Sequence, residues 1–218
     1  MKHAVITGSS RGIGLALTRK LIAENNIEII GSSTSGKHSL QSANFSCYPL
    51  NLNDKKSIEA FVKQIENKKI DYLVNNAGIL QYSDNPGIDF QKLEETFNVN
   101  LFGTIRFTEL LISRLNQNAH IVTVTSEWGS FSEPGFNEYQ PHYKMSKAAL
   151  NMYSKLLSER LKKRGIRVSA FDPGWVKTDM GGKNASRTPE EVATELLYLM
   201  KSKVETGNFW HKGKIREW

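Results

Sequence analysis

The feature that most constrains the fold is a glycine-rich turn that directly follows the first apolar segment. A short β-branched run at residues 3–7 leads into Gly8, Gly12 and Gly14, and an apolar-periodic segment then continues to about Asn25. Glycine permits a tight turn and a close approach to a ligand. The helix N-terminus behind it favours a pyrophosphate. The pattern therefore predicts a strand, a phosphate-binding turn and a helix; a plain strand–helix turn is the alternative, because the spacing departs from Gly-x-Gly-x-x-Gly.

Strand-like and helix-like segments alternate along the rest of the chain. Predicted strands cover residues 3–7, 27–32, 46–52, 71–75, 119–125 and 166–171, and predicted helices cover 12–25, 54–68, 89–117, 141–164 and 188–202. The last helix begins with a capping box, Thr188-Pro189-Glu190-Glu191. Residues 33–45 are too short and polar for a helix, and the tail from Gly207 predicts a short extended segment or hairpin around Lys212-Gly213-Lys214.

This alternation predicts an α/β fold, a Rossmann-like doubly wound parallel sheet with helices on both faces. The 218 residues suit a single domain, residues 1–218, since no linker, repeat or low-complexity tract divides them. In such a sheet the ligand lies beyond the carboxyl ends of the strands.

Composition indicates a cytoplasmic protein without a metal centre. Met1-Lys2-His3 is not followed by a signal-peptide core, and no stretch approaches the roughly 20 apolar residues of a membrane span. The single cysteine, Cys47, excludes an internal disulfide and fits a reducing compartment. Histidine, cysteine and acidic residues show no metal-site spacing, so no metal is expected.

The net charge of +7 raises nucleic acid as a partner class. The basic residues are dispersed, however, and the densest run, Arg160 to Arg164, ends a predicted helix before Gly165. Cations at that position complement the helix dipole. We therefore expect neither a nucleic-acid nor a membrane partner.

Tyr143 and Lys147 lie four residues apart near the start of the predicted helix 141–164. This spacing places a phenol and an ammonium on one helical face. A nearby cation stabilises the phenolate and lowers the pKa of a tyrosine toward the range where proton transfer is efficient. An isolated pair of this kind is more often an inward ring beside a solvated lysine, so its meaning depends on the rest of the chain.

Small and polar residues follow the other predicted strands. The fourth strand ends in Asn75-Asn76-Ala77-Gly78, the fifth in Thr125-Ser126, and the sixth leads into Asp172-Pro173-Gly174. Asn100 stands inside a predicted helix, which is costly unless its amide has a partner. For Asn98 and Asn100 the pattern leaves open a solvent-facing position, and for residues 172–182 a plain surface turn and loop.

Together these residues resemble the short-chain dehydrogenase/reductase family over nearly the whole chain. The resemblance is carried by Thr7-Gly8-x-x-x-Gly12-x-Gly14, Asn75-Asn76-Ala77-Gly78, Asn100, Ser126, Tyr143-x-x-x-Lys147 and Pro173-Gly174. Residues 143–151 and 173–182 look more narrowly like C-factor and sniffer-type carbonyl reductases. The family implies a nicotinamide-dependent oxidoreductase that interconverts a carbonyl and an alcohol.

The resemblance also implies residue roles. Tyr143 would be the general acid or base, Ser126 would hold the carbonyl oxygen, Lys147 would lower the pKa of Tyr143 and hold the ribose, and Asn100 would position a relay water. The expected cofactor-binding set is Gly8, Ser10, Arg11, Gly12, Ile13, Gly14, Thr34, Asn51, Leu52, Asn76, Ala77, Gly78, Tyr143, Lys147, Pro173, Gly174, Val176 and Thr178. Asn51 stands where the family often has aspartate, and an amide still reaches an adenine ring.

The cofactor is expected to be NADP(H) rather than NAD(H). An NAD-selective protein places an acidic residue about 20 positions beyond the glycine loop. Counting from Gly14 reaches Thr34, and residues 31–38 contain no carboxylate. Arg11 lies where basic residues of NADP-preferring relatives meet the 2′-phosphate, and Lys37 or His38 could assist. The alternative is a solvated Arg11 and similar binding of both cofactors.

The expected substrate is a small to medium carbonyl or alcohol with an apolar or aromatic body. Trp128, Tyr139, Trp175 and Met180 flank the predicted chemistry and form the expected substrate pocket. The aromatic residues between Ser126 and Tyr143 fit a pocket wall and core or dimer-contact positions equally well.

A homodimer or higher homo-oligomer is expected, paired through the segments 89–117 and 141–164. Apolar residues extend around much of the second helix, at Leu150, Met152, Tyr153, Leu156, Leu157 and Leu161, and packing within the chain is the alternative for these positions. The alternative to an enzyme is a dinucleotide-binding regulatory protein with little turnover. The presence of Asn100, Ser126, Tyr143 and Lys147 together favours the enzyme.

Overall fold

The chain forms one mostly parallel, eight-stranded sheet in the order β3-β2-β1-β4-β5-β6-β7-β8, in a computed structural model that describes residues 1–133 and 135–218. The strands are β1 (Lys2–Ile6), β2 (Ile27–Ser33), β3 (Phe45–Pro49), β4 (Ile70–Asn75), β5 (Leu115–Val124), β6 (Arg167–Phe171), β7 (Asn208–His211) and β8 (Lys214–Arg216). The helices are α1 (Gly12–Ile22), α2 (Lys55–Gln64), α3 (Phe90–Phe97), α4 (Thr104–Leu111), α5 (Pro141–Leu161) and α6 (Pro189–Lys201). The predicted doubly wound α/β fold is confirmed.

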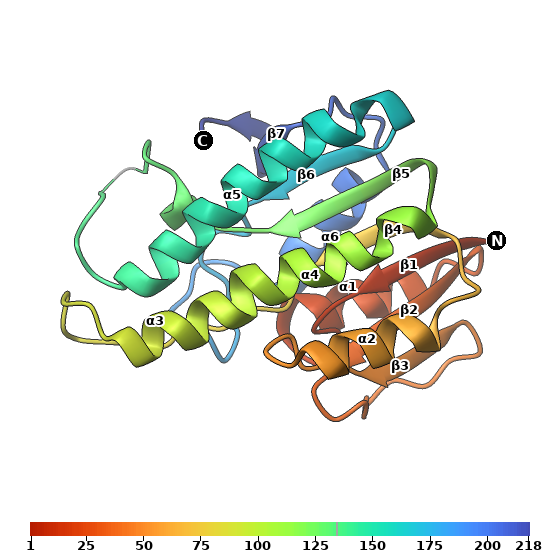
Figure 1. Cartoon of the computed structure of the whole chain (residues 1–218), viewed down its shortest axis with the longest axis horizontal. Helices are drawn as coiled ribbons and strands as arrows, with labels where there is room; N and C mark the ends of the chain where they lie inside the picture. Colours follow the sequence, from red (N-terminus) through yellow and green to blue (C-terminus); the bar gives the residue numbers. More distant parts are fainter. Residues whose placement is uncertain (134) are drawn as a thin grey trace.

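Helices cover both faces of the sheet because successive strand side chains point to opposite sides. Val5 and Ile30 pack in one core with α2, α4 and α5, whereas Ala4, Ile6 and Ile29 pack in the other with α1 and α6. Figure 1 shows α4 and α5 crossing in front of the strands, with α1 and α6 behind them. The strand order reverses direction between β1 and β4, which creates the crevice where a doubly wound sheet binds ligands.

The predicted helix 89–117 is wrong as one continuous element. It divides into α3, a π-helical turn at Asn98–Gly103, α4 and a 3₁₀ turn at Ile112–Arg114, and β5 already begins at Leu115. The physical reason lies at Gly103, where a Cβ atom would lie 2.2 Å from the carbonyl oxygen of Leu52. The π turn accommodates this close backbone approach and also orients Asn100 inward, where its side chain is buried.

The other helices match their predictions with ends shifted by a few residues. The capping box of α6 is present, with Thr188 and Glu191 in both reciprocal hydrogen bonds. The third strand ends at Pro49 rather than at residue 52, because the chain turns at Pro49 toward the crevice. The predicted C-terminal hairpin is confirmed: β7 pairs parallel with β6 and antiparallel with β8.

The basic run at residues 160–164 has structural partners. Arg160 contacts Glu109 at 2.5 Å, and Arg164 donates to the carbonyl oxygens of Ile112 and Leu115. These contacts fasten the end of α5 to the segment before β5, as the interpretation of this run as a helix end predicts. Within the described ranges, no helix has the length and apolar character needed to cross a membrane.

Candidate active site

A cleft of about 550 Å³ opens at the edge of the sheet where β1, β2, β4, β5 and β6 end. Its wall residues are Gly8, Ser10, Arg11, Gly12, Ile13, Ser32, Ser33, Thr34, Ser35, Leu50, Asn51, Leu52, Asn76, Ala77, Gly78, Ile79, Val99, Val124, Thr125, Tyr143, Lys147, Pro173, Thr178, Asp179 and Met180. Segments that are far apart in the sequence therefore meet in one site, as expected for the carboxyl edge of a parallel sheet.

The glycine turn after β1 packs against the segment after β4. Gly8 and Gly12 have φ values of +66° and +53°, a conformation that other residues rarely adopt. The Asn76 Nδ2 donates to the carbonyl oxygens of Thr7 and Gly8 at 2.9 and 3.1 Å. Gly14 does not line the cleft: it is buried behind the turn, and a Cβ atom there would lie 2.2 Å from the Gly8 carbonyl oxygen.

The N-terminus of α1 faces the cleft without a competing carboxylate, because its first turn contains no acidic residue. Its first N–H groups lack partners within the helix and carry partial positive charge. Arg11 precedes this helix and forms an exposed ion pair with Asp179 at 3.3 Å, across the cleft mouth. The sequence interpretation did not include Asp179, whose role follows only from the approach of its loop to the glycine turn.

The wall at the end of β2 is built from consecutive hydroxyl side chains, Ser32 to Ser35. Only Thr34 was predicted among them, although the run of hydroxyls after a strand was a signal for all four. The Ser32 Oγ accepts a hydrogen bond from the Gly8 N–H at 3.1 Å, which joins this wall to the glycine turn. His38, expected to assist at this end, instead contacts the Ser9 carbonyl oxygen through Nε2 and packs edge-on against Phe45.

Tyr143 and Lys147 both line the cleft from the first turns of α5. Burial raises the pKa of Tyr143 above its usual value, the charge of Asp172 adds to this, and the Ser126 side chain partly opposes it. The pKa of Tyr143 is therefore raised overall rather than lowered, in contrast to the expectation, because burial of the phenol is the dominant cause.

Lys147 is itself buried, and burial lowers its pKa to about 8. Its Nζ donates to the Val124 carbonyl oxygen at 3.0 Å and lies 5.4 Å from the centre of the Tyr143 ring. The amine thus contacts the phenol through the ring face while it is held by the end of β5.

Asn100 has partners for its whole amide, which settles the open question about its orientation. Its Oδ1 accepts from the Ile79 N–H at 2.8 Å, and its Nδ2 donates to the Ile79 carbonyl oxygen and the Ser146 Oγ. It lies behind the cleft wall and fastens the segment after β4 to α5. A Cβ on Gly78 would lie 3.2 Å from the Asn100 Oδ1 and 3.6 Å from the Lys147 Nζ, so both groups lie beside Gly78.

Several predicted site residues do not line the cleft. Ser126 follows the wall residue Thr125, and its Oγ accepts from the Trp128 N–H at 3.1 Å. Gly174 and Val176 flank wall positions in the loop after β6, and Val176 is buried beneath that loop.

Three of the four residues of the expected aromatic pocket do not line this cleft. Trp128 packs edge-on against Tyr143, with ring centres 5.9 Å apart, so it contacts the Tyr143 ring. Tyr139 is exposed, and the Trp175 Nε1 donates to the Gly181 carbonyl oxygen of its own loop. Met180 alone of the four lines the cleft, where Ile79, Val99 and Val124 supply further apolar surface. Whether each of these residues lines the cleft depends on the direction of its side chain in a loop, which the local sequence does not encode.

Titratable groups that could bind a metal do not gather in this site. Across residues 1–133 and 135–218, no three His, Cys, Asp or Glu side chains come together as candidate ligands. The buried His120 contacts the Met200 carbonyl oxygen and the Ser169 Oγ, and burial lowers its pKa to about 3, which keeps the imidazole neutral. His120 therefore has a structural role in the core.

The glycine turn, the Asn76 segment and the Tyr143–Lys147 pair meet in one cleft, and a model of the short chain dehydrogenase family matches residues 2–189. The chain belongs to this family. The short chain dehydrogenase fold binds NAD(P), and the family consists of oxidoreductases. The predicted family resemblance is thereby confirmed.

Similar proteins include reductases of two kinds. The chain is 32% identical to the 3-oxoacyl-[acyl-carrier-protein] reductase FabG of Escherichia coli over 188 residues, which cover 82% of this chain and 75% of that protein. Among solved structures, it is similar to an NADPH-bound carbonyl reductase from chicken fatty liver, with a TM-score of 0.89 and 25% identity over 100% of this chain and 99% of the other. It is also similar to the putative carbonyl reductase Sniffer of Caenorhabditis elegans, with a TM-score of 0.86 and 26% identity over both whole chains.

Proposed function

We propose that this short chain dehydrogenase catalyses the NADP(H)-dependent reduction of a carbonyl to an alcohol, with Tyr143 as the general acid. The observation that carries the proposal is the shared cleft: Tyr143 and Lys147 line the same cavity as the glycine turn and the N-terminus of α1. A cofactor held by the glycine turn would thus extend toward a phenol that can supply a proton.

The residues of the cleft fit a nicotinamide dinucleotide. A Cβ on Gly12 would lie 3.0 Å from the Thr178 side chain, so glycine leaves room there for a phosphate between the turn and the loop after β6. The hydroxyls of residues 32–35 and the unpartnered N–H groups of α1 are donors suited to ribose and phosphate oxygens. When bound, the nicotinamide supplies the hydride.

The chain's own residues handle the proton and orient the substrate. Tyr143 donates its phenolic proton to the carbonyl oxygen, and the Ser126 hydroxyl hydrogen-bonds the same oxygen as negative charge develops on it. Lys147 holds the ribose hydroxyls. Asn100 fixes the segment after β4 against α5, so that Gly78 stays beside Asn100 and Lys147. The raised pKa of Tyr143 keeps the phenol protonated at neutral pH, which supports the reductive direction.

The substitution Tyr143→Phe tests this function with a panel of carbonyl compounds and NADPH. Turnover should fall about 10²–10⁴-fold, the usual contribution of a general acid, while the cofactor dissociation constant changes little. Near-wild-type turnover in Tyr143→Phe would overturn the mechanism. Tight NADPH binding without turnover on any substrate would favour the regulatory, dinucleotide-binding alternative.

The preference for NADP(H) rests on charge near the turn. Residues 31–38 contain no carboxylate that would repel a 2′-phosphate, and the hydroxyls of Ser33, Thr34 and Ser35 line this end of the cleft. The Arg11 guanidinium is exposed at the same end, where only Asp179 competes for it. The NADPH-bound carbonyl reductase from chicken fatty liver has the same overall fold, which is consistent with this preference.

The proposed substrates are small to medium carbonyl compounds with an apolar body. Met180, Ile79 and Val99 supply apolar surface to the same cleft that Tyr143 lines. The segment between Ser126 and Tyr143 adds exposed aromatic rings at the periphery, Phe131, Phe136 and Tyr139. We place the protein in the cytoplasm, in keeping with its single cysteine and its NADP(H) chemistry.

We also propose a homodimer through α4 and α5. The structure divides the apolar residues of α5, since Leu150, Leu157 and Leu161 are buried in the core of the chain itself. Met152 and Leu156 are 60% and 63% exposed, and Leu110 on α4 is 40% exposed. Light scattering of Leu156→Glu should show monomers where the unaltered protein shows dimers.

A further inference from the structure

The loop that forms the far wall of the cleft is held by charged residues of the C-terminal hairpin. Asp172 follows β6 and precedes the wall residue Pro173, and its side chain is only 1% exposed. The Asp172 Oδ2 contacts the Arg216 Nη1 at 2.5 Å and the His211 Nδ1 at 3.0 Å. Its Oδ1 accepts from the Gly174 N–H at 2.9 Å, which fixes the turn itself. A buried carboxylate is therefore paired with two groups from the hairpin.

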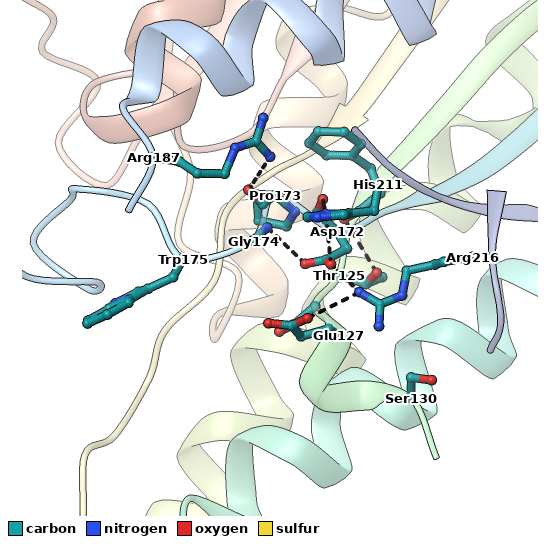
Figure 2. A network of polar contacts seen from close by, with 12 residues as sticks. Thr125, Glu127, Ser130, Asp172, Pro173, Gly174, Trp175, Arg187, His211 and Arg216 are labelled. Atoms are coloured by element: carbon teal, nitrogen blue, oxygen red, sulfur yellow. Dashed lines mark hydrogen bonds and ion pairs between the residues drawn. The ribbon is translucent and has the colours of Figure 1, made fainter. Parts of the chain in front are cut away.

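Arg216 also contacts the segment that follows β5. Its Nη1 lies 3.3 Å from the Glu127 Oε2, and Glu127 directly follows Ser126. Figure 2 shows the guanidinium between Asp172 and Glu127, with His211 above the same carboxylate. One arginine therefore joins the ends of β5 and β6, on which Ser126 and Pro173 are placed.

The C-terminal hairpin is itself held in place by the sheet and by buried aromatic packing. β7 extends the sheet beside β6, and the Asp172 N–H donates to the Trp210 carbonyl oxygen at 2.8 Å. Phe209 is fully buried and stacks on Trp218 with ring centres 5.5 Å apart. The Ser130 Oγ donates to the Glu217 carbonyl oxygen, so the last residues also contact the segment after Ser126.

A second strap holds the same turn from the opposite side. The Arg187 Nη1 donates to the Pro173 carbonyl oxygen at 2.7 Å, and its Nη2 pairs with the Glu195 Oε2 at 2.5 Å. The other oxygen of Glu195 accepts from the Gly213 N–H in the turn of the hairpin. Both straps begin in the hairpin and end on residues 172–174.

We propose that His211 and Arg216 are positioning residues for the reaction of Tyr143: they clamp Asp172 and Glu127 and thereby fix the strand ends that carry Pro173 and Ser126. This inference rests on the proposed function of Tyr143. It assigns to the C-terminal hairpin, which lies outside the residues 2–189 matched by the family model, a part in the active site.

The clamp has an electrostatic consequence at the phenol. Burial favours the neutral form of Asp172, but its hydrogen bonds with His211 and Gly174 and the charge of Arg216 lower its pKa overall, so Asp172 stays ionised. After burial, the charge of Asp172 is the next cause that raises the pKa of Tyr143. Arg216 and protonated His211 offset part of that charge. Further charged groups around the clamp come from neighbouring elements: Glu127, Glu133, Lys147, Arg187 and Lys212.

Two substitutions of opposite sign test the clamp. Arg216→Gln leaves the charge of Asp172 less compensated, so the ionisation of Tyr143 should move to higher pH by about one unit. Asp172→Asn removes that charge and should move it to lower pH by a similar amount. Arg216→Lys keeps a cation but loses the planar fork that reaches two carboxylates. The ionisation of Tyr143 should therefore stay close to that of the unaltered protein, whereas turnover should recover less fully. Lys214→Gln is the matched control, because it removes one exposed cation from the same strand.

The readouts are the pH profile of turnover and the absorbance titration of the phenol, obtained as the difference between each variant and the same variant carrying Tyr143→Phe. Turnover in Arg216→Gln should fall about tenfold, mainly in kcat. The titration needs no turnover, so it tests the clamp even if the proposed function fails. The inference would be overturned if the ionisation of Tyr143 moved in the same direction in Arg216→Gln and Asp172→Asn. Shifts in these variants no greater than the shift in Lys214→Gln would also overturn it. If Arg216→Gln does not fold, Arg216→Lys and Asp172→Asn decide the question.

Discussion

The two walls of the cleft keep their shape by different physical means. The glycine wall, residues 7–14 and 75–78, is held by backbone contacts: Gly14 lies against the Gly8 carbonyl, and Asn76 bonds the main chain of Thr7 and Gly8. The opposite wall, residues 172–180, is held by charged side chains, chiefly Arg216 and Arg187. The first wall therefore depends on the absence of side chains, and the second depends on charge pairs made with distant residues.

This difference predicts that steric changes break the glycine wall at every pH, whereas changes of charge alter the second wall in a pH-dependent way. Backbone packing tolerates no added volume, because interiors are close-packed. Ion pairs respond to protonation of their members.

The largest effect is expected for Gly14→Ala. A Cβ atom there would lie 2.2 Å from the Gly8 carbonyl oxygen and 2.7 Å from the Asn76 Nδ2. Relieving this overlap should lower the free energy of unfolding by about 3 kcal/mol and weaken NADPH binding by about 100-fold. Denaturant unfolding and titration calorimetry measure both. Gly182→Ala is the control: its φ of +73° strains alanine, but no atom lies within 4 Å. Equal losses in the two variants would contradict a steric cause.

Lys147 comes next, since in the proposed function its amine would contact both the phenol and the cofactor. Lys147→Met should raise the NADPH dissociation constant about 30-fold, as expected for the loss of hydrogen bonds from a charged group, and should also lower kcat. Lys144→Met is the matched variant on the same helix. The Lys144 Nζ contacts the Asn137 carbonyl oxygen at 2.8 Å and faces the segment after β5, so its loss should leave NADPH affinity nearly unchanged. Fluorescence titration of both variants decides between these outcomes.

The pair Arg11–Asp179 joins the two walls and should show a smaller effect. Both side chains are exposed, 75% and 78%, so the pair itself contributes little to stability. Arg11→Ala should weaken NADPH binding about 10-fold and leave NADH binding unchanged, because the Arg11 guanidinium would pair with the 2′-phosphate, which NADH lacks. Asp179→Asn removes the competing carboxylate and should strengthen NADPH binding by about 2-fold. Similar losses for both cofactors in Arg11→Ala would refute the assignment.

The smallest effect concerns the stability that His211 provides. Its pKa is raised above 6.5, first by the hydrogen bond to Asp172, so the pair stabilises the fold fully below pH 6.5 and loses this contribution as the pH rises through the higher, folded value. His211→Gln should therefore lower the free energy of unfolding by about 1 kcal/mol near pH 6, and less near pH 9. Urea unfolding at both pH values measures the gap. A difference in free energy of unfolding between His211→Gln and the unaltered protein that grows with pH would contradict the pairing. For Gly14→Ala, the corresponding difference should not change with pH.

Much of the fold could be predicted because its signals are local. Alternating periodicity located the helices and the strands β1 to β6, and Thr188 with Glu191 identified the start of α6. The break of the predicted helix 89–117 had no local signal. It arises where Gly103 meets the Leu52 backbone, a contact between segments that are distant in the sequence.

The candidate site was predicted unevenly for the same reason. Tyr143, Lys147 and most of the glycine-turn residues line the cleft because their spacing alone places them at strand ends or on one helical face. Trp128, Tyr139 and Trp175 do not, since their directions depend on loop contacts such as that of Trp175 with Gly181. A lowered pKa of Tyr143 was predicted from the proximity of Lys147, but burial of the phenol, which the sequence does not show, raises this pKa.

The sequence by itself determined the α/β class, the glycine turn and the family, because each follows from residue types at fixed short spacings. Only the tertiary structure decided that Asp172 is buried and that Arg216, 44 residues away, neutralises it beside Glu127. Burial and long-range ion pairing are properties of the folded arrangement, and no short pattern in the chain specifies which charges meet. The backbone of the active site is therefore encoded locally, and its electrostatics are set by the packing of the C-terminal hairpin against the sheet.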